Sequence, residues 1–213
     1  MKKSVCTLFL LLASMTLFAP LQALGEQFRE DVHYSFIIPE QPGASGDRVM
    51  VMEFFWYGCS HCYSLEPFLE KWLETKPEYV DFVRFPALLS GPTRILHGKT
   101  FYALKMMGLG DGLHEKIFSA LHDKGKALKT QGEMEAFLEE QGVAVDEFRK
   151  LMNSNAVKLP VRRAAKLANK YDVHGVPAII IDGKYSVGGL TGNIMMQVTD
   201  HLIEKVRAAK GVK

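Results

Sequence analysis

Residues 49–63 read VMVMEFFWYGCSHCY, an almost continuous apolar run that ends in a turn and two cysteines. An uninterrupted apolar run of this length is typical of a strand that is buried on both faces. A helix is expected over about 60–75, because apolar side chains recur at helical spacing from Leu65 to Trp72. Residues 79–88 alternate enough to predict a second strand. Together they predict a βαβ unit with the cysteines where its first strand meets its helix.

The middle of the chain has a different pattern. Residues 93–157 show helical periodicity throughout, and the capping-box pattern at 130–133 opens one of the expected helices. Asp146 is a candidate cap for another helix. A further helix is expected over about 157–170, with Pro160 tolerated in its first turn.

Strand-like sequence returns near the C-terminus. Asp182-Gly183 separates two apolar runs within 177–187, which predicts a β-hairpin, and a last helix is expected from Thr191. A short edge strand is expected near 34–38. The element order is therefore βαβ, a helical block, then ββα, which predicts an α/β fold with an inserted all-helical subdomain.

The N-terminus has the features of a secretory signal peptide. Lys2 and Lys3 precede an uncharged apolar run over 8–19, and small residues follow at 23–25. Cleavage is expected after Gly25; an uncleaved anchor is the alternative, although the apolar run is short for a membrane span. Removal of the signal peptide leaves only two of the three cysteines, too few for a disulfide-stabilised scaffold.

The composition excludes two classes of protein. The 213 residues carry 26 Lys and Arg against 24 Asp and Glu, so the chain lacks the basic surplus of a nucleic-acid-binding protein. With 47% apolar residues and 13 Phe, it has enough apolar surface to form a core and is not intrinsically disordered.

The sequence Cys59-Ser60-His61-Cys62 carries the expected chemistry. Cys59 falls at the start of the helix, where free N–H groups, the helix dipole and a protonated His61 all favour a thiolate. Cys62 comes one turn later and is expected to be the buried sulfur, with Cys59 exposed. A redox pair is therefore predicted. An inert structural disulfide and half of a zinc site are the alternatives, but the other histidines do not cluster as zinc ligands.

The run EFFWYGCSHCY (53–63), together with GVPA (175–178), resembles the DsbA family of periplasmic thiol oxidases. The resemblance implies a thioredoxin fold with a helical insertion. The implied division of the chain is a signal peptide over 1–25, thioredoxin-like parts over 26–92 and 158–213, and the insertion over 93–157. This chain departs from the family's usual Pro-His between the cysteines: Ser60 adds an N–H and a hydroxyl near the sulfurs, which bears on the redox potential.

The resemblance also implies roles for residues outside the cysteine pair. Val176 and Pro177 correspond to a cis-proline loop that faces the cysteines and pairs with an extended substrate; a proline that merely separates a helix from a strand is the alternative. Glu53 corresponds to a buried acid that handles protons beneath Cys62, and its alternative role is that of a satisfied structural carboxylate. Glu66 matches an acidic position of the family but is expected on a solvated helix face.

The implied function is the introduction of disulfide bonds into exported proteins that carry reduced cysteines. The implied location is the periplasm, with re-oxidation by a membrane quinone reductase of the DsbB type. No cofactor is needed beyond the Cys59–Cys62 disulfide, and no metal is expected. A disulfide isomerase or reductase of the same fold is the nearest alternative, although residues 26–48 are too few for an N-terminal dimerisation domain. A non-redox thiol metal carrier or a chaperone is the alternative from another class.

Overall fold

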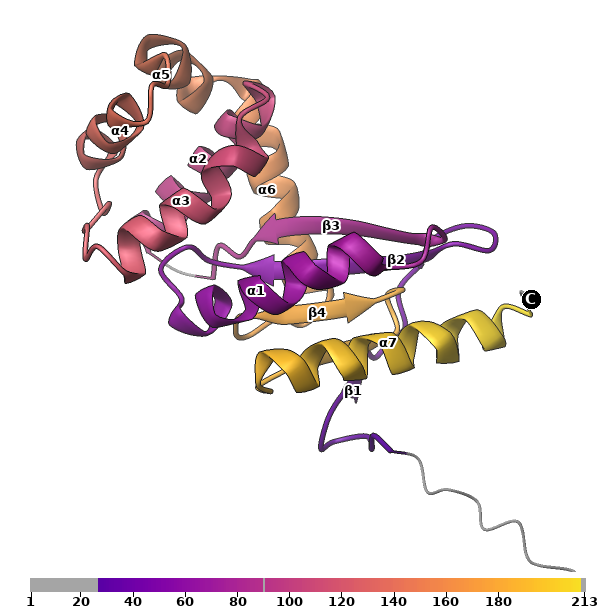
Figure 1. The fold of residues 1–213 in the computed structure, drawn as a ribbon. Helices are drawn as coiled ribbons and strands as arrows, with labels where there is room; N and C mark the ends of the chain where they lie inside the picture. The colour runs from indigo at the N-terminus through magenta and orange to yellow at the C-terminus, as the bar shows by residue number, and fades with distance from the viewer. Residues whose placement is uncertain (1–26, 90, 212–213) are drawn as a thin grey trace, which may run out of the picture.

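A computed structural model describes residues 27–89 and 91–211; the predicted signal peptide lies outside this part of the chain. A five-stranded sheet has the spatial order β1-β5-β4-β2-β3. Figure 1 shows β4, β2 and β3 side by side. The strands are β1 (Ser35–Phe36), β2 (Val49–Phe55), β3 (Val80–Pro86), β4 (Ala178–Ile181) and β5 (Tyr185–Gly188). The helices are α1 (Ser60–Thr75), α2 (Pro92–Met106), α3 (Gly110–His122), α4 (Gln131–Glu140), α5 (Val145–Asn153), α6 (Asn155–Lys170) and α7 (Gly192–Ala209).

The sheet is mixed, and β2 lies between two different neighbours. β2 pairs in parallel with β3 across the α1 crossover, which is the predicted βαβ unit. β4 runs antiparallel to both β2 and β5, and the β4–β5 connection is the predicted hairpin. Glu53 in β2 lies opposite Arg84 in β3, so the register places an acid and a base side by side in the middle of the sheet.

Both faces of the sheet are covered by helices. α1 and α7 lie next to each other over one face, where Val51 of β2 packs, and α6 lies on the other, where Phe54 packs (Figure 1). This alternation follows from the two-residue period of a strand. By the same period, Glu53 projects toward the face that α1 covers.

Two predicted helix starts were wrong. α6 begins at Asn155, because the Ser154 hydroxyl caps it by accepting a hydrogen bond from the Val157 N–H at 3.3 Å. Pro160 therefore lies in the second turn and not in the first. α5 has Ala144 at its N-cap, so Asp146 lies inside the first turn, where its charge favours the helix start and its carboxylate accepts a hydrogen bond from Arg149 at 2.7 Å. The other predicted cap was correct: Thr130 and Glu133 form a complete capping box at α4.

The helices α2–α5 gather beyond one edge of the sheet, and α6 connects them to the sheet (Figure 1). The core that these helices enclose also contains Phe55 of β2 and Cys62 of α1. Val157, Val161 and Ala164 of α6 pack into the helical core. Ala168, one turn further on, packs into the core beneath the sheet. The predicted boundary between the insertion and the second thioredoxin-like part, after residue 157, falls inside α6.

Candidate active site

The two cysteines begin α1, as the sequence predicts. Cys59 is the N-cap residue, and its sulfur accepts a hydrogen bond from the Cys62 N–H at 3.3 Å. The Cys59 N–H donates to the Trp56 carbonyl at 2.9 Å, which closes the turn between β2 and α1. Cys59 is half-buried, whereas Cys62 is fully buried, and both are free thiols. The accessible sulfur is therefore the one at the helix N-terminus.

The environment separates the acidities of the two thiols. A hydrogen bond from the Cys62 thiol, followed by hydrogen bonds from the Cys62 and His61 N–H groups, lowers the pKa of Cys59 to about 6. The same sulfur–sulfur hydrogen bond and burial raise the pKa of Cys62 far above that of an ordinary thiol. Cys59 is thus a thiolate at neutral pH, the form that reacts with disulfides, while Cys62 keeps its proton.

The two residues between the cysteines are exposed. The positive charge of His61 lowers the pKa of Cys59, but it contributes less than the hydrogen bonds from Cys62. Ser60 is the first residue of α1, and its carbonyl accepts a hydrogen bond from the Ser64 hydroxyl at 3.0 Å. The hydrogen bond from the Cys62 thiol, followed by the backbone N–H groups of the helix start, therefore stabilises the thiolate more than the charge of His61 does.

The loop before β4 faces Cys59 from the other side. The peptide bond between Val176 and Pro177 is cis, and the Cys59 sulfur lies 3.3 Å from the Val176 carbonyl oxygen, to which it can donate a hydrogen bond only in its protonated form. These residues are 117 positions apart in the sequence. The structure thus brings together the two motifs on which the sequence resemblance was based.

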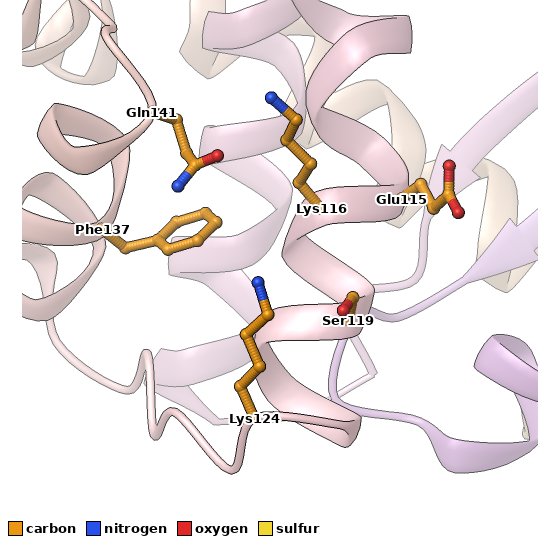
Figure 2. A pocket seen from close by; sticks show the side chains of 6 residues that line it. All are labelled: Glu115, Lys116, Ser119, Lys124, Phe137 and Gln141. Atoms are coloured by element: carbon orange, nitrogen blue, oxygen red, sulfur yellow. The ribbon is translucent and has the colours of Figure 1, made fainter.

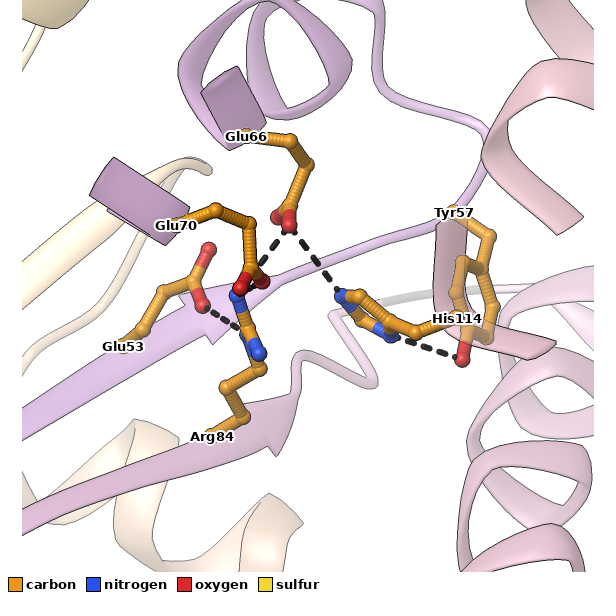
Figure 3. Close-up of polar contacts among 6 residues, drawn as sticks. All are labelled: Glu53, Tyr57, Glu66, Glu70, Arg84 and His114. Atoms are coloured by element: carbon orange, nitrogen blue, oxygen red, sulfur yellow. Dashed lines mark hydrogen bonds and ion pairs between the residues drawn. The ribbon is translucent and has the colours of Figure 1, made fainter. Parts of the chain in front are cut away.

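A cluster of buried charges lies on the α1 side of the sheet (Figure 3). Arg84 donates from Nε to Glu53 at 2.9 Å, and from Nη2 to Glu66 at 3.1 Å and Glu70 at 2.7 Å. Glu53 is fully buried and Glu66 is only 6% exposed. The expectation that Glu66 lies on a solvated helix face was therefore wrong, because α1 packs over the strand that carries Arg84.

The burial of these carboxyls changes their acidity. Desolvation, then repulsion by Glu66, raises the pKa of Glu53 to about 7, and desolvation raises the pKa of Glu66 to about 7 as well, against the opposing charge of Arg84. Within the described part of the chain, the Oε1 atoms of both have no hydrogen-bond partner. The charge of Glu53 also raises the pKa of Cys62. The cluster can therefore hold a proton near the buried sulfur at neutral pH.

Sequence reasoning missed the residues that extend this cluster toward the insertion. His114 of α3 lies 3.0 Å from the Tyr57 hydroxyl through Nδ1 and 3.5 Å from Glu66 through Nε2 (Figure 3). Burial, followed by the charge of Arg84, lowers the pKa of His114 to about 4, so its imidazole is neutral. Arg84 had a signal in the sequence, a charge in the middle of an apolar strand, but nothing pointed to His114.

Other parts of the described chain add little to the site. A shallow pocket of about 280 Å³ opens between α3 and α4 (Figure 2), and none of the predicted site residues line it. Among residues 27–89 and 91–211, no group of three or more His, Cys, Asp or Glu side chains could hold a metal ion. No helix in the same range has the length and apolar character needed to cross a bilayer.

A cysteine pair of this kind, at the first helix of a thioredoxin-like sheet and opposite a cis-proline loop, defines a thiol:disulfide oxidoreductase. The sequence model described as the DSBA-like thioredoxin domain matches residues 84–204. The chain belongs to the DsbA family.

Proteins of this family are similar in sequence to most of this chain. The thiol:disulfide interchange protein DsbA of Pseudomonas syringae pv. tomato is 38% identical over 93% of this chain and 94% of its own length. That of Pseudomonas aeruginosa PAO1 is 41% identical over 85% of each. The crystal structure of Pseudomonas aeruginosa DsbA superposes with a TM-score of 0.77 at 39% identity, covering 83% of this chain and 93% of that one. The similarity supports the thioredoxin fold with a helical insertion.

Proposed function

We propose that this protein oxidises pairs of thiols in exported proteins, with Cys59 as the attacked sulfur and Cys62 as the buried partner. The observation that carries the proposal is the N-cap position of Cys59, whose sulfur accepts the Cys62 N–H at 3.3 Å and has a pKa of about 6. A thiolate with a low pKa is a good leaving group, and its stability favours the reduced form of the enzyme. A dithiol with these properties is an oxidant.

The exchange takes place in two steps. A substrate thiolate attacks Cys59 in the enzyme disulfide; the Cys59–Cys62 bond breaks, and Cys62 leaves as a thiolate that takes up a proton. A second substrate thiolate then attacks the substrate sulfur of the mixed disulfide, and Cys59 leaves as a thiolate. The substrate gains one disulfide and loses two electrons to the enzyme, which ends as a dithiol.

The surrounding residues have supporting roles in this proposal. Val176 and Pro177 bind the substrate backbone next to Cys59, which the 3.3 Å contact between the Cys59 sulfur and the Val176 carbonyl supports. His61 and Ser60 act on the Cys59 thiolate through charge and helix geometry. Glu53 supplies the proton that Cys62 takes up, which its burial and raised pKa of about 7 support.

The reaction must be completed outside the enzyme. The reduced pair has to pass two electrons to an oxidant, and we propose a membrane quinone reductase of the DsbB type for this step. The protein's place is then the periplasm, where its substrates emerge with reduced cysteines. The Cys59–Cys62 disulfide is the only redox group that the proposal requires.

Incubation of the oxidised protein with a peptide that carries two thiols tests the proposal. We expect stoichiometric oxidation of the peptide, a disulfide that glutathione reduces readily, and no reaction with the Cys59→Ala variant. A disulfide that resists glutathione would assign a reductase, and rearrangement of mispaired disulfides without net oxidation would assign an isomerase. Metal retained by the reduced protein through purification would favour a thiol metal carrier.

A further inference from the structure

One face of α3 is turned toward the active-site turn. His114, Phe118 and His122 recur every four residues, so their side chains lie on the same side of the helix. All three contact Tyr57, the residue two positions before Cys59. The pocket between α3 and α4, in contrast, is lined by other α3 residues, so the two sides of this helix have different surroundings (Figure 2).

Tyr57 is held at both its side chain and its backbone. Its hydroxyl bonds with His114 Nδ1 at 3.0 Å (Figure 3), and its ring packs edge-on against Phe118 with centroids 5.1 Å apart. Its carbonyl lies 2.8 Å from His122 Nε2. Because a carbonyl can only accept, His122 Nε2 is the donor in this bond. The peptide group that leads into the cysteine motif is therefore fixed by a side chain of the insertion.

Tyr63, which directly follows Cys62, is held by the same end of α3. Its ring stacks on the His122 imidazole with centroids 5.0 Å apart and an interplanar angle of 10°. Its hydroxyl donates to Asp123 at 2.6 Å. His122 thus contacts the residues on both sides of the cysteine motif, one through a hydrogen bond and the other through ring stacking.

We propose that His122 is a positioning residue for thiol exchange: its hydrogen bond to the Tyr57 carbonyl fixes the turn that places Cys59 at the N-cap of α1, and its stacking on the Tyr63 ring orients the imidazole for that bond. This inference rests on the proposed function of Cys59. The N-cap geometry depends on two contacts of Cys59, from its sulfur to the Cys62 N–H at 3.3 Å and from its N–H to the Trp56 carbonyl at 2.9 Å. Release of the intervening Tyr57–Gly58 peptide loosens both contacts and so weakens the stabilisation of the thiolate.

Two replacements separate the hydrogen bond from the stacking. His122→Phe keeps a ring against Tyr63 but has no donor for the Tyr57 carbonyl, and His122→Gln keeps an N–H donor but has no ring. The half-buried position of His122 leaves room for both side chains. For His122→Phe we expect the equilibrium constant for reduction of the enzyme disulfide by glutathione to fall about two- to tenfold. This range corresponds to the loss of one ordinary hydrogen bond. The Cys59 thiolate should titrate at a correspondingly higher pH, and His122→Gln should lie closer to the wild type in both measurements.

A second histidine of the insertion provides a matched control. His97 bonds with the Leu128 carbonyl through Nε2 at 2.9 Å, and this carbonyl lies outside the active-site turn. Its ring packs against Trp56 and Tyr57 with centroids 6.2 and 6.0 Å apart, and a phenylalanine ring keeps these two contacts. His97→Phe should lower the free energy of unfolding of the oxidised and reduced forms equally and leave the glutathione equilibrium unchanged.

The inference is overturned if His122→Phe titrates and equilibrates like the wild type, if His122→Gln loses as much as His122→Phe, or if His97→Phe shifts the equilibrium equally. The wild-type titration is a separate test of the proposed function. If Cys59 of the wild type ionises like an ordinary thiol, the proposed function fails, whatever the differences among the variants.

Discussion

Acidification should lower the free energy of unfolding of the reduced protein more than that of the oxidised protein, because only the reduced form has the Cys59 thiolate. The folded reduced form holds Cys59 with a pKa of about 6, against about 8.5 for a cysteine in an unfolded chain. A lowered folded-state pKa contributes stability that is fully present above the unfolded pKa and is lost as the pH falls through the folded pKa. The oxidised form has no thiolate, so it lacks this contribution at every pH.

The magnitude follows from the two pKa values. Linkage gives the reduced form about 2 kcal/mol at about pH 7.5 and close to zero at about pH 5. Solvent screening at the half-buried sulfur makes this an upper value, and we expect a change of about 1–2 kcal/mol. The disulfide opposes it with about 2 kcal/mol from closing a very short loop in the unfolded chain. The two forms should therefore have similar stability near neutral pH, and the reduced form should fall behind in acid.

Denaturant unfolding of both forms at about pH 5 and about pH 7.5 measures this difference. Comparison of the two redox forms cancels the titration of buried carboxyls such as Glu53, which both forms share. Cys62 does not interfere, because its raised pKa leaves it protonated in the folded state throughout this range, and an unfolded thiol is still largely protonated there.

The Cys59→Ala variant is the control: it forms no disulfide and has no thiolate at the helix start, so the pH profile of its stability should parallel that of the oxidised wild type and not that of the reduced wild type. If the difference in unfolding free energy between the two wild-type forms stays constant from about pH 5 to about pH 7.5, the helix start does not stabilise a thiolate. The electrostatic argument for an oxidant would then be refuted.

Three further predictions concern single residues. His61→Ala should raise the pKa of Cys59 by less than about one unit, because the charge of His61 contributes less than the hydrogen bonds from Cys62; an absorbance titration that overlays the wild type would show no electrostatic role. Cys62→Ala should accumulate mixed disulfides on non-reducing gels and Cys59→Ala should not, and the reverse pattern would exchange the two sulfurs. The raised pKa of Glu66, about 7, gives stability that is present in acid and lost as the pH rises through that value. Glu66 alone should therefore cost the oxidised wild type about 2 kcal/mol between about pH 5 and about pH 8, in addition to the loss from Glu53, whose pKa is also about 7. Glu66→Gln should keep most of that stability in denaturant melts, and parallel pH profiles would contradict the raised pKa.

The parts of the site that local sequence determines could be predicted. The buried strand β2, the N-cap position of Cys59 and the burial of Cys62 follow from an apolar run, a turn and helical spacing within fifteen residues. The loop at Val176 and Pro177 lies far away in the sequence, and only the resemblance to a family placed it opposite Cys59.

The parts of the site that depend on packing between distant elements could not be predicted from the sequence. Glu66 lies next to the apolar stripe of α1, and its burial is set by Arg84 on a strand whose register is not visible in the sequence. Arg84 itself could have been paired with Glu53, since two opposite charges in adjacent buried strands are costly unless they meet. His114 and His122 act through a helix crossing that no local pattern encodes.

The sharing of α6 between two cores limits how this protein can be rearranged. An α-helix turns about 100° per residue, so one residue inserted between Ala164 and Ala168 would rotate the insertion relative to the sheet by more than a quarter of a turn. The α3 side chains that contact Tyr57 would then lose these contacts. A chimera that exchanges the insertion with that of a relative should therefore include α6 to its end at Lys170. A junction after residue 157 would separate the α3 face that contacts Tyr57 from the helix that sets its orientation.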